Sequence, residues 1–216
     1  MQDFLQKFIE QVQQTSLLEY IAVVTGIASV FFSKKENILV YPVGLINTII
    51  YVYISIEGSL FGEASVNFYY TVMSIYGWML WARKDQQHKP VLHITNSSSK
   101  EWLQQLLFFA AFYIAIFLAL HWAKNAFYAN TIPLLDAFAS ATAFTGMWLM
   151  AKKKVESWYW WLATNVTSVP LYFIKGYALT SVYYILLFVL AVFGLMEWKR
   201  RASDVRESSK FDFENQ

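Results

Sequence analysis

Seven long apolar runs follow one another along the chain, and short polar or charged segments separate them. A helix needs roughly 20 mostly apolar residues to cross the hydrocarbon core of a bilayer, and each run is close to that length. The runs cover residues 17–33, 38–56, 64–82, 102–122, 134–151, 157–174 and 179–198. The pattern predicts an all-α integral membrane protein with seven transmembrane helices.

Local signals mark the start of two of these helices. Ser16 is followed three residues later by Glu19, and Ser98 is followed in the same way by Glu101. This Ser-x-x-Glu spacing is typical of a capping box, in which the side chain of each residue bonds to the backbone N–H of the other. We therefore expect helices to begin directly after Ser16 and Ser98.

The residues ahead of the first run have a different pattern. Between residues 1 and 16, apolar side chains recur on one helical face, namely Phe4, Leu5, Phe8, Ile9 and Val12. A short amphipathic helix of this kind suits the boundary between lipid and water. We expect a leader over 1–16 that lies in the membrane interface, with a short solvated helix as the alternative.

Composition agrees with a membrane protein and argues against several kinds of chemistry. Of the 216 residues, 57% are apolar and only 15% are charged. Cysteine is absent, and His88, His93 and His121 do not have the spacing of metal ligands. We therefore expect no cofactor and no metal site.

Positive charge is distributed unevenly along the chain. Of the 17 Lys and Arg residues, 14 fall in the segments 34–35, 83–100 and 152–154 or after residue 198. Alternating spans place these segments on one side, which the positive-inside rule makes cytoplasmic. The C-terminus is then cytoplasmic and the N-terminus outside, and the polar tail over 202–216 is expected to be disordered. Because basic residues lie between apolar runs, we take the net charge of +2 as an orientation signal and expect no nucleic-acid partner.

The second half of the chain repeats parts of the first. At an offset of 118 residues, Asn47 aligns with Asn165, as do a Lys-Lys pair and an Ile-x-Gly pattern in each half. At an offset of 117, the Gly-x-Met-x-Trp pattern of 77–81 recurs at 194–198. A near-constant offset over several patterns predicts a duplication.

The predicted duplication defines the domain organisation. We expect two three-helix repeats over 17–82 and 134–201, joined by a loop and a linker helix over 83–133. Because four spans separate equivalent points, both repeats face the same way. Parallel repeats in this 3+1+3 order are a SWEET-like architecture of membrane transporters, with the substrate site at the repeat interface near the midplane.

A stretch inside the sixth run mixes aromatic and polar side chains. It reads W-Y-W-W-L-A-T-N-V-T-S-V-P-L-Y, and one helical stripe holds Trp158, Trp161, Asn165 and Tyr172. Asn165 lies near mid-span, where hydrocarbon offers its amide no hydrogen-bond partner. Rings beside an orienting amide predict a site for a small aromatic ligand. In the alternative interpretation, Asn165 and Asn47 join helices and the tryptophans form an interfacial belt.

These residues also resemble a known family. The pattern W-x-x-W-x-x-x-N, followed after six further residues by Tyr, and the motif Y-G-W-M-L-W from Tyr76 to Trp81 resemble signatures of the PnuC family of bacterial vitamin transporters. The resemblance covers residues 17–201 and includes the 3+1+3 plan. It implies uptake of nicotinamide riboside by facilitated diffusion through a homotrimer in the bacterial inner membrane, with relatives that carry thiamine or riboflavin. It also implies a separate cytoplasmic kinase that traps the imported substrate by phosphorylation.

Nicotinamide riboside and thiamine each carry a fixed positive charge on an aromatic ring, which aromatic faces attract by cation–π contact. Our hypothesis is that the cationic ring is held by the side chains of Trp158, Trp161, Tyr172, Tyr51 and Tyr70. Hydrogen bonds to the polar groups of the ligand are then assigned to Asn165, Asn47 and Asn67. Family members that carry nicotinamide riboside often have Gln at the position of Asn67, ten residues before the glycine of Y-G-W, so thiamine stays the alternative substrate.

The remaining polar residues bear on mechanism. Thr164 and Thr167 lie off the stripe and are expected to bond back to their own helix. Ionisable side chains lie near the ends of the predicted spans, whereas ion-coupled carriers usually keep them near the bilayer centre, so we expect uncoupled transport. The sequence has no deep nucleophile with a base, carboxylate pair or metal cluster, which argues against an enzyme. A membrane receptor that binds the same ligand without transporting it stays an alternative.

Overall fold

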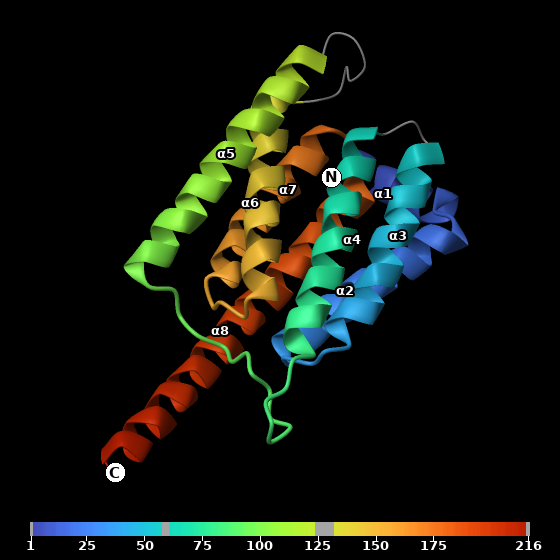
Figure 1. The fold of residues 1–216 in the computed structure, drawn as a ribbon. Helices are drawn as coiled ribbons and strands as arrows, with labels where there is room; N and C mark the ends of the chain where they lie inside the picture. Colours follow the sequence, from blue (N-terminus) through green and yellow to red (C-terminus); the bar gives the residue numbers. More distant parts are fainter. Residues whose placement is uncertain (1, 58–60, 124–131, 215–216) are drawn as a thin grey trace.

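The computed structural model describes residues 2–57, 61–123 and 132–214, and the regular elements within these ranges are eight α-helices (Figure 1). They are α1 (Gln2–Gln14), α2 (Leu17–Lys34), α3 (Val40–Glu57), α4 (Phe61–Trp81), α5 (Ser99–Ala123), α6 (Pro133–Ala151), α7 (Ser157–Ile174) and α8 (Ala178–Glu214). The helices α2 to α8 match the seven predicted runs within a few residues, except at the end of α8. The predicted all-helical class is confirmed.

The helices differ in how well they suit lipid. Within the described ranges, α2, α3, α5, α6 and α8 are long and apolar enough to cross a membrane. α4 and α7 carry more hydroxyl and amide groups, and such groups in a spanning helix face protein or a water-filled path. α4 and α7 also hold most of the predicted site residues.

Both predicted helix starts are confirmed. The backbone N–H of Ser16 donates to the Glu19 carboxylate at 2.8 Å, and the N–H of Glu19 donates to the Ser16 hydroxyl at 3.2 Å. Ser98 and Glu101 make the same two bonds at 2.8 and 3.3 Å. The helical part of the leader prediction is also confirmed, because α1 occupies residues 2–14.

In the described part of the tail, for which disorder was expected over 202–216, α8 continues as a helix to Glu214. Oppositely charged side chains at helical spacing support the extension. Just before the tail, the carboxylate of Glu197 accepts hydrogen bonds from Arg200 at 2.9 Å and from Arg201 at 2.8 Å, and in the first turn of the tail Asp204 Oδ2 lies 4.0 Å from Arg200 Nη1. Pairs at i,i+3 and i,i+4 lie on one helical face and stabilise a solvated helix slightly, an effect that composition alone does not reveal.

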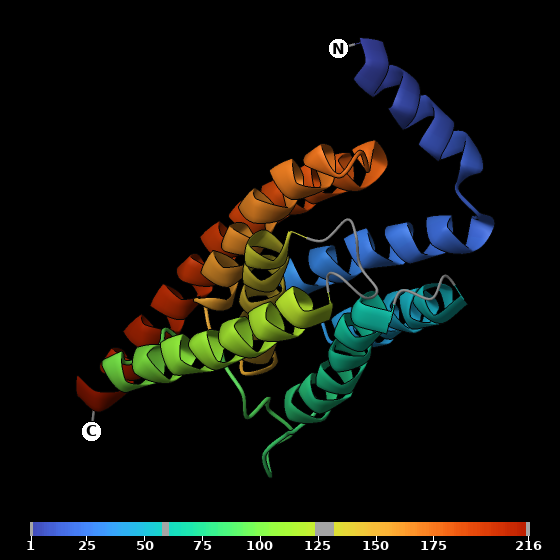
Figure 2. The same cartoon turned by 90° about the horizontal axis from the view of Figure 1, so that it is seen from above.

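The helices α2 to α4 and α6 to α8 form two groups of three, with α5 outside them (Figure 1 and Figure 2). In one group α3 packs on α2 and α4, and in the other α7 packs on α6 and α8, while α5 packs on α6. The groups meet where α2 lies against α8 and where α4 lies against α6. These two contacts are equivalent, because in each the first helix of one group packs on the third helix of the other.

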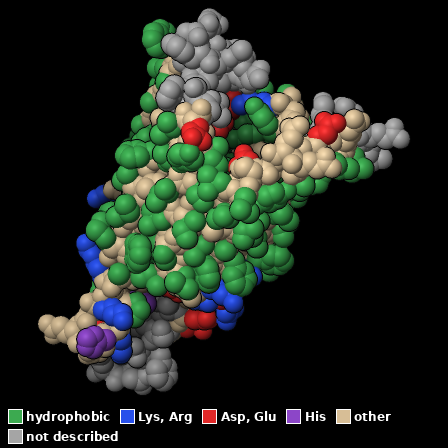
Figure 3. Space-filling model, turned by 90° about the vertical axis from the view of Figure 1, so that its right-hand side faces the viewer, with side chains coloured by type: hydrophobic (Ala, Val, Ile, Leu, Met, Phe, Trp, Pro, Cys, Tyr) green, Lys and Arg blue, Asp and Glu red, His purple; other side chains and the backbone are tan. Residues whose placement is uncertain are grey.

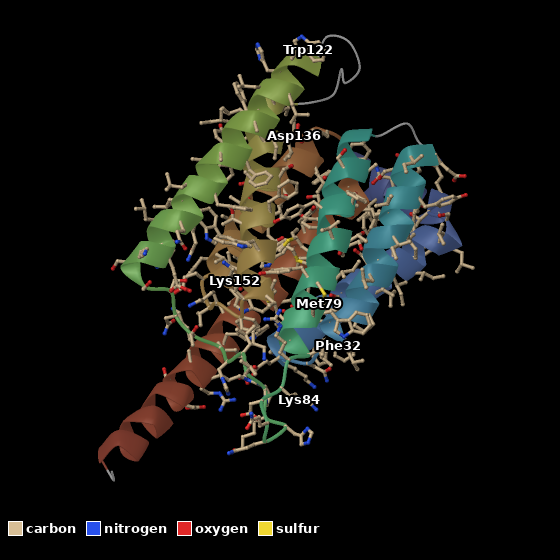
Figure 4. All side chains as sticks on the ribbon, viewed as in Figure 1. Phe32, Met79, Lys84, Trp122, Asp136 and Lys152 are labelled. Atoms are coloured by element: carbon tan, nitrogen blue, oxygen red, sulfur yellow. The ribbon has the colours of Figure 1, made fainter. Side chains whose placement is uncertain are left out.

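The two ends of the bundle differ in charge. The turns after α2 and α6 and the segment between α4 and α5 lie at one end, which we call the basic end. Figure 4 labels Lys84 and Lys152 at this end and Asp136 and Trp122 at the opposite end. On the face seen in Figure 3, hydrophobic side chains cover the middle and charged ones gather toward the two ends. This distribution is typical of a protein that spans a bilayer.

The main core cluster lies at the basic end, and the first group contributes one characteristic contact to it. Tyr41 at the start of α3 packs edge-on against Trp81 at the end of α4, with ring centroids 5.2 Å apart and an interplanar angle of 87°. Gly77 leaves the space that the Tyr41 ring occupies, because a Cβ at this position would collide with that ring.

The second group makes the same contact with different residues. Trp158 at the start of α7 packs edge-on against Trp198 of α8, at 5.6 Å and 88°. Gly194 leaves the space for the Trp158 ring. Each of the three residues follows its counterpart in the first group by 117 positions.

Hydrogen bonds and an ion pair join the two groups at this end. Trp81 Nε1 donates to the carbonyl oxygen of Ala151 at 3.2 Å, and Trp198 Nε1 donates to that of Ser33 at 3.0 Å. Both indole N–H groups are thereby satisfied inside the protein, each by the first helix of the other group. The second link is Lys153, whose Nζ lies 2.6 Å from Glu36 Oε1.

Glu36 and Lys153 occupy equivalent turns. They are 117 positions apart, and both have a left-handed backbone, with φ of 57° and 51°. Lys153 also donates to the carbonyl oxygen of Leu92 at 2.9 Å, and Arg201 donates to the second carboxylate oxygen of Glu36 at 3.1 Å. The segment between α4 and α5 is thereby tied to both groups.

Nearer the middle of the bundle, both groups make a contact at equivalent positions, but the small and the large residue of that contact lie on opposite helices in the two groups. In the first group Gly44 of α3 lies against the hydroxyl group of Ser29 on α2, and in the second Trp161 of α7 lies against Gly146 of α6. These pairs also differ by 117 positions. A large ring therefore enters the second group where the first has no side chain.

The uniform offset of 117 corrects the predicted pairing of two amides. Asn47 corresponds to Thr164, and each of them bonds to the first helix of its own group. Asn165 corresponds to Thr48, so the match between the two asparagines at 118 is one residue out of register. Successive side chains of an α-helix point in directions about 100° apart, so a residue one position later faces a different neighbouring helix.

Candidate functional site

Aromatic side chains from both groups meet in the middle of the bundle. Tyr70 of α4 and Trp161 of α7 have ring centroids 6.2 Å apart, and both are half-buried. Tyr70 also lies 6.1 Å from Phe144 of α6, on which Tyr69 stacks at 4.0 Å. The structure thus brings two predicted site residues together across the interface between α4 and the second group.

A second aromatic set adjoins the first and includes residues that the sequence analysis missed. Tyr172 stacks on Tyr184 of α8, with centroids 5.2 Å apart and an interplanar angle of 11°. Tyr70 and Tyr172 thus each contact a ring of the second group, and the ligand contact predicted for Tyr51 stays a prediction. The available signal was the Tyr-Tyr pair at 183–184 inside an aliphatic run, because a phenol hydroxyl at membrane depth needs a partner.

Asn165 is a predicted site residue in the middle of the bundle with a buried polar atom that lacks a partner among the described residues. Its side chain is 2% exposed, and its Oδ1 accepts no hydrogen bond from any residue that the structure describes. Buried oxygens are nearly always paired, because an unpaired one costs about 1–3 kcal/mol. Trp161 lies one helical turn away on the same face. A ligand that donates a hydrogen bond beside the Trp161 ring would satisfy Asn165 Oδ1.

The two threonines that flank Asn165 do not compete for such a ligand. The hydroxyl groups of Thr164 and Thr167 donate to carbonyl oxygens four residues earlier, each at 3.0 Å. The prediction that they bond back to their own helix is confirmed. Thr164 also bonds to the hydroxyl of Thr142 on α6 at 2.9 Å, which fixes α7 against its neighbour.

Asn47 and Tyr183 approach the same point on α2. A Cβ added at Gly26 would lie 2.6 Å from the Tyr183 hydroxyl and 2.8 Å from Asn47 Nδ2, so only glycine leaves room for both. Asn47 Nδ2 donates to the carbonyl oxygen of Ala22 at 2.6 Å. Asn47 thus joins α3 to α2, as the alternative interpretation expects, and its contact with a ligand stays a prediction.

Asn67 directs its amide along its own helix. Its Nδ2 donates to the carbonyl oxygen of Glu63 at 3.0 Å. Its backbone carbonyl accepts from the Thr71 hydroxyl at 2.9 Å, and Thr71 also bonds to Thr48 on α3. A ligand contact through Asn67 would require the side chain to give up its bond to Glu63, so this role too stays a prediction.

Trp158 lies apart from the central aromatic residues, in the core of the basic end. Its side chain is 1% exposed and packs against Gly194 and Trp198. Its Nε1 has no hydrogen-bond partner among the described residues, and neither has the hydroxyl of Tyr41 at the equivalent position. The unpaired group is therefore shared by both halves, and the ligand contact predicted for Trp158 stays a prediction.

Charged residues close the opposite end of the second group. Lys175 Nζ lies 2.6 Å from Asp136 Oδ1, and the other carboxylate oxygen of Asp136 accepts from the backbone N–H of Ile132 at 2.7 Å. Figure 4 shows Asp136 near the end of the bundle, away from its middle. Among the described residues, no cluster of three or more His, Asp and Glu is arranged for a metal ion.

Comparison with known proteins adds a family and a fold. A family model described as nicotinamide mononucleotide transporter matches residues 16–200. The nicotinamide riboside transporter PnuC of Escherichia coli (strain K12) is 24% identical over 209 residues, which cover 88% of this chain and 87% of that protein. PnuC of Neisseria mucosa is 26% identical over 194 residues, covering 86% and 73%. The riboflavin/roseoflavin transporter RibM of Streptomyces davaonensis is 22% identical over 180 residues, covering 83% of each chain.

A solved structure agrees with these relatives. The crystal structure of the vitamin B3 transporter PnuC superposes with a TM-score of 0.71 at 20% identity, covering 94% of this chain and 89% of that one. The likeness establishes the fold, and the resemblance inferred from the two aromatic motifs is confirmed. The chain is a multi-pass membrane transporter, and it belongs to the nicotinamide mononucleotide transporter family.

Proposed function

We propose that this protein imports a vitamin and binds it by the aromatic ring of the vitamin. Nicotinamide riboside is the preferred substrate. Relatives named for nicotinamide riboside support this choice, and the relative named for riboflavin keeps that vitamin as an alternative beside thiamine. The described residues around Asn165 offer rings, hydroxyls and an amide. Such groups suit a ribose better than a phosphate, which favours basic side chains.

The unpaired Oδ1 of Asn165 is the observation that carries the proposal. In the proposed site, Trp161, Tyr70 and Tyr172 hold the cationic ring, and Asn165 accepts a hydrogen bond from the carboxamide or a hydroxyl group of the substrate. Tyr51 of α3 and Tyr184 of α8 complete the wall of the proposed site. Asn47, Asn67 and Trp158 are kept as contacts that form only if their side chains move.

The proposed architecture is the 3+1+3 order of seven spanning helices. The groups α2–α4 and α6–α8 are the two parallel repeats and α5 is the linker, which the contacts repeated at an offset of 117 support. The basic end is assigned to the cytoplasm and the N-terminus to the outside, because 14 of 17 Lys and Arg residues fall on that side. The family resemblance adds a homotrimer in the bacterial inner membrane.

Transport is proposed to be facilitated diffusion, in which one group rocks against the other around the site. The described ionisable residues lie toward the helix ends, so no deep group is at hand to couple an ion. Net uptake then requires a separate cytoplasmic kinase that phosphorylates the vitamin. Flux into proteoliposomes of the purified protein is expected to persist with an ionophore, and flux that collapses would overturn uncoupled transport.

The substrate is tested by thermal unfolding of the detergent-purified protein with nicotinamide riboside, thiamine or riboflavin. A ligand that binds the folded state at 100 times its Kd adds about 2.7 kcal/mol, which raises the melting temperature by about 5–10 °C for a chain of this size. A shift with nicotinamide riboside alone is the expected result. A shift with thiamine or riboflavin alone selects that alternative, and no shift with any of the three contradicts the proposed substrate class.

Binding is separated from transport by a flux measurement on the same preparation. Uptake of the stabilising vitamin into proteoliposomes is expected to saturate and to run in both directions along its gradient. Stabilisation without flux would mean that the chain is a receptor instead.

A further inference from the structure

Lysine side chains at the basic end differ in the groups that they contact. Lys153 pairs with Glu36 at 2.6 Å, and Lys154 pairs with Glu101 at 2.7 Å. Four others lie over an aromatic ring and have no carboxylate within ion-pair distance among the described side chains. We call them the lysine–ring belt, and they are Lys34, Lys35, Lys152 and Lys199.

The belt has a consistent geometry. From Nζ to ring centroid, the distances are 5.0 Å for Lys34 over Phe193, 4.4 Å for Lys35 over Phe31, 3.9 Å for Lys152 over Trp148 and 5.3 Å for Lys199 over Tyr159. The lysines come from the ends of α2 and α6 and from α8, so both groups contribute. Cation–π attraction holds each ammonium group close to its ring.

The rings place these charges at the level of lipid headgroups. Phe31, Tyr159 and Phe193 are 41%, 39% and 49% exposed and belong to the apolar outer surface. On the face seen in Figure 3, Lys and Arg side chains border the hydrophobic band at one end. An ammonium group that sits on a lipid-facing ring therefore stands at the boundary of lipid and water.

Lys152 shows most clearly that this position favours an anion. Burial lowers the pKa of the Lys152 ammonium group, because part of its hydration is lost. An oxygen of a phosphate would replace the missing water through a charge-assisted hydrogen bond. Lys175 at the opposite end has no such need, since Asp136 already neutralises it.

We propose that the lysine–ring belt binds the phosphate groups of anionic phospholipids in the leaflet at the basic end. A lipid is chosen over a soluble phosphate because three of the four ammonium groups rest on rings exposed on the apolar outer surface, and a lipid contacts both the charge and the ring. The inference concerns the outer surface and does not depend on which vitamin is carried.

The test compares phosphatidylglycerol with phosphatidylcholine on the full-length protein. Purified protein is mixed with each lipid, and retained lipids are counted by native mass spectrometry. Retention of phosphatidylglycerol is expected to exceed that of phosphatidylcholine. The combined variant Lys34→Gln, Lys35→Gln, Lys152→Gln, Lys199→Gln is expected to weaken the retention of phosphatidylglycerol by more than about tenfold, because one lysine near an anionic surface contributes about fivefold. The matched control removes the same charge from the loop side through Arg83→Gln, Lys84→Gln, Lys89→Gln and Lys100→Gln, and is expected to retain the lipid.

Further arms keep the proposal falsifiable. The combined Lys→Arg variant of the belt keeps the charge and is expected to retain the preference, which separates charge from folding. Equal retention of the two lipids by the unaltered protein overturns the proposal, as does equal loss in the belt and loop variants. Stabilisation by inorganic phosphate that matches stabilisation by phosphatidylglycerol would assign the belt to a soluble anion and overturn it as well.

Discussion

The two three-helix groups agree at the basic end and diverge in the middle of the bundle. At the basic end, an aromatic ring, a glycine and a tryptophan repeat at an offset of 117 with the same edge-on geometry. In the middle, Trp161 stands where the first group has Gly44, and Asn165 stands where it has Thr48.

This difference separates scaffold from site. Contacts that both groups need to pack on each other have been kept in both, whereas the residues that each group contributes to the proposed site are not repeated at the equivalent positions of the other group. A ligand such as a nucleoside has no internal symmetry, so it cannot be bound identically by two equivalent halves. The divergent positions are therefore the better guide to function.

The strongest challenge to this comparison is Asn165→Leu. Loss of the amide oxygen is expected to reduce uptake of nicotinamide riboside about 10–100-fold, because one hydrogen bond to a buried group is worth about 1–3 kcal/mol. Initial uptake rates in proteoliposomes, corrected for the amount of folded protein, measure the effect. Thr48→Val at the counterpart position is the control and should transport nearly normally; equal losses at both positions would mean that the two halves share the site.

The shared scaffold predicts equal damage from Gly77→Ala and Gly194→Ala. Each added Cβ would collide with a ring, of Tyr41 or of Trp158, and overpacking of this kind costs about 1–3 kcal/mol. Melting in detergent should therefore fall by several degrees in each variant. Gly146→Ala is the milder control, since its Cβ would lie 3.2 Å from the Trp161 ring; a large loss in one scaffold variant and none in the other would break the comparison.

Glu36→Gln probes the contact that joins equivalent turns. The variant leaves the Lys153 side chain, 5% exposed, without its carboxylate. We expect the free energy of unfolding to fall by less than the value for a fully buried pair, which is about 3–5 kcal/mol, because Glu36 is partly exposed. The melting temperature should fall and should recover in part in the double variant Glu36→Gln, Lys153→Met, whereas a double variant no better than the single one would show that the charge pair is not the cause.

The smallest effects are expected for Trp81→Phe and Trp198→Phe. Each removes one indole hydrogen bond to a carbonyl oxygen of the other group, worth about 1 kcal/mol, or about 2–4 °C in melting temperature. The two rings lie 6.1 Å apart, so the double variant should depart from the sum of the single ones. Unequal effects of the two single variants would show which of the two indole hydrogen bonds between the groups contributes more to stability.

Much of the fold follows from the sequence because hydropathy and capping act locally. The helix limits at Ser16 and Ser98 were predictable from four side chains. The correct counterpart of Asn165 was not predictable, because a single matching residue such as Asn47 cannot distinguish an offset of 118 from one of 117. The packed ring, glycine and tryptophan of each group make that distinction, because all three repeat at 117. Tyr184 was missed since tyrosine counts as apolar in a hydropathy run, although its hydroxyl makes it polar. The continuation of α8 into the tail was not predicted, because a pair such as Arg200 with Asp204 depends on helical spacing, which composition does not record.

α8 connects the two ends of the molecule in one uninterrupted rod. It has 37 residues and is therefore about 55 Å long. It touches the proposed site through Tyr184 and the core of the basic end through Trp198, and then continues beyond the bundle (Figure 1). Geometrically it is a lever: a tilt of about 10° at Trp198 would move its far end, about 24 Å away, by about 4 Å. A fluorescent probe attached near the end of α8, on the aqueous side, could therefore report changes in the arrangement of the membrane-embedded helices.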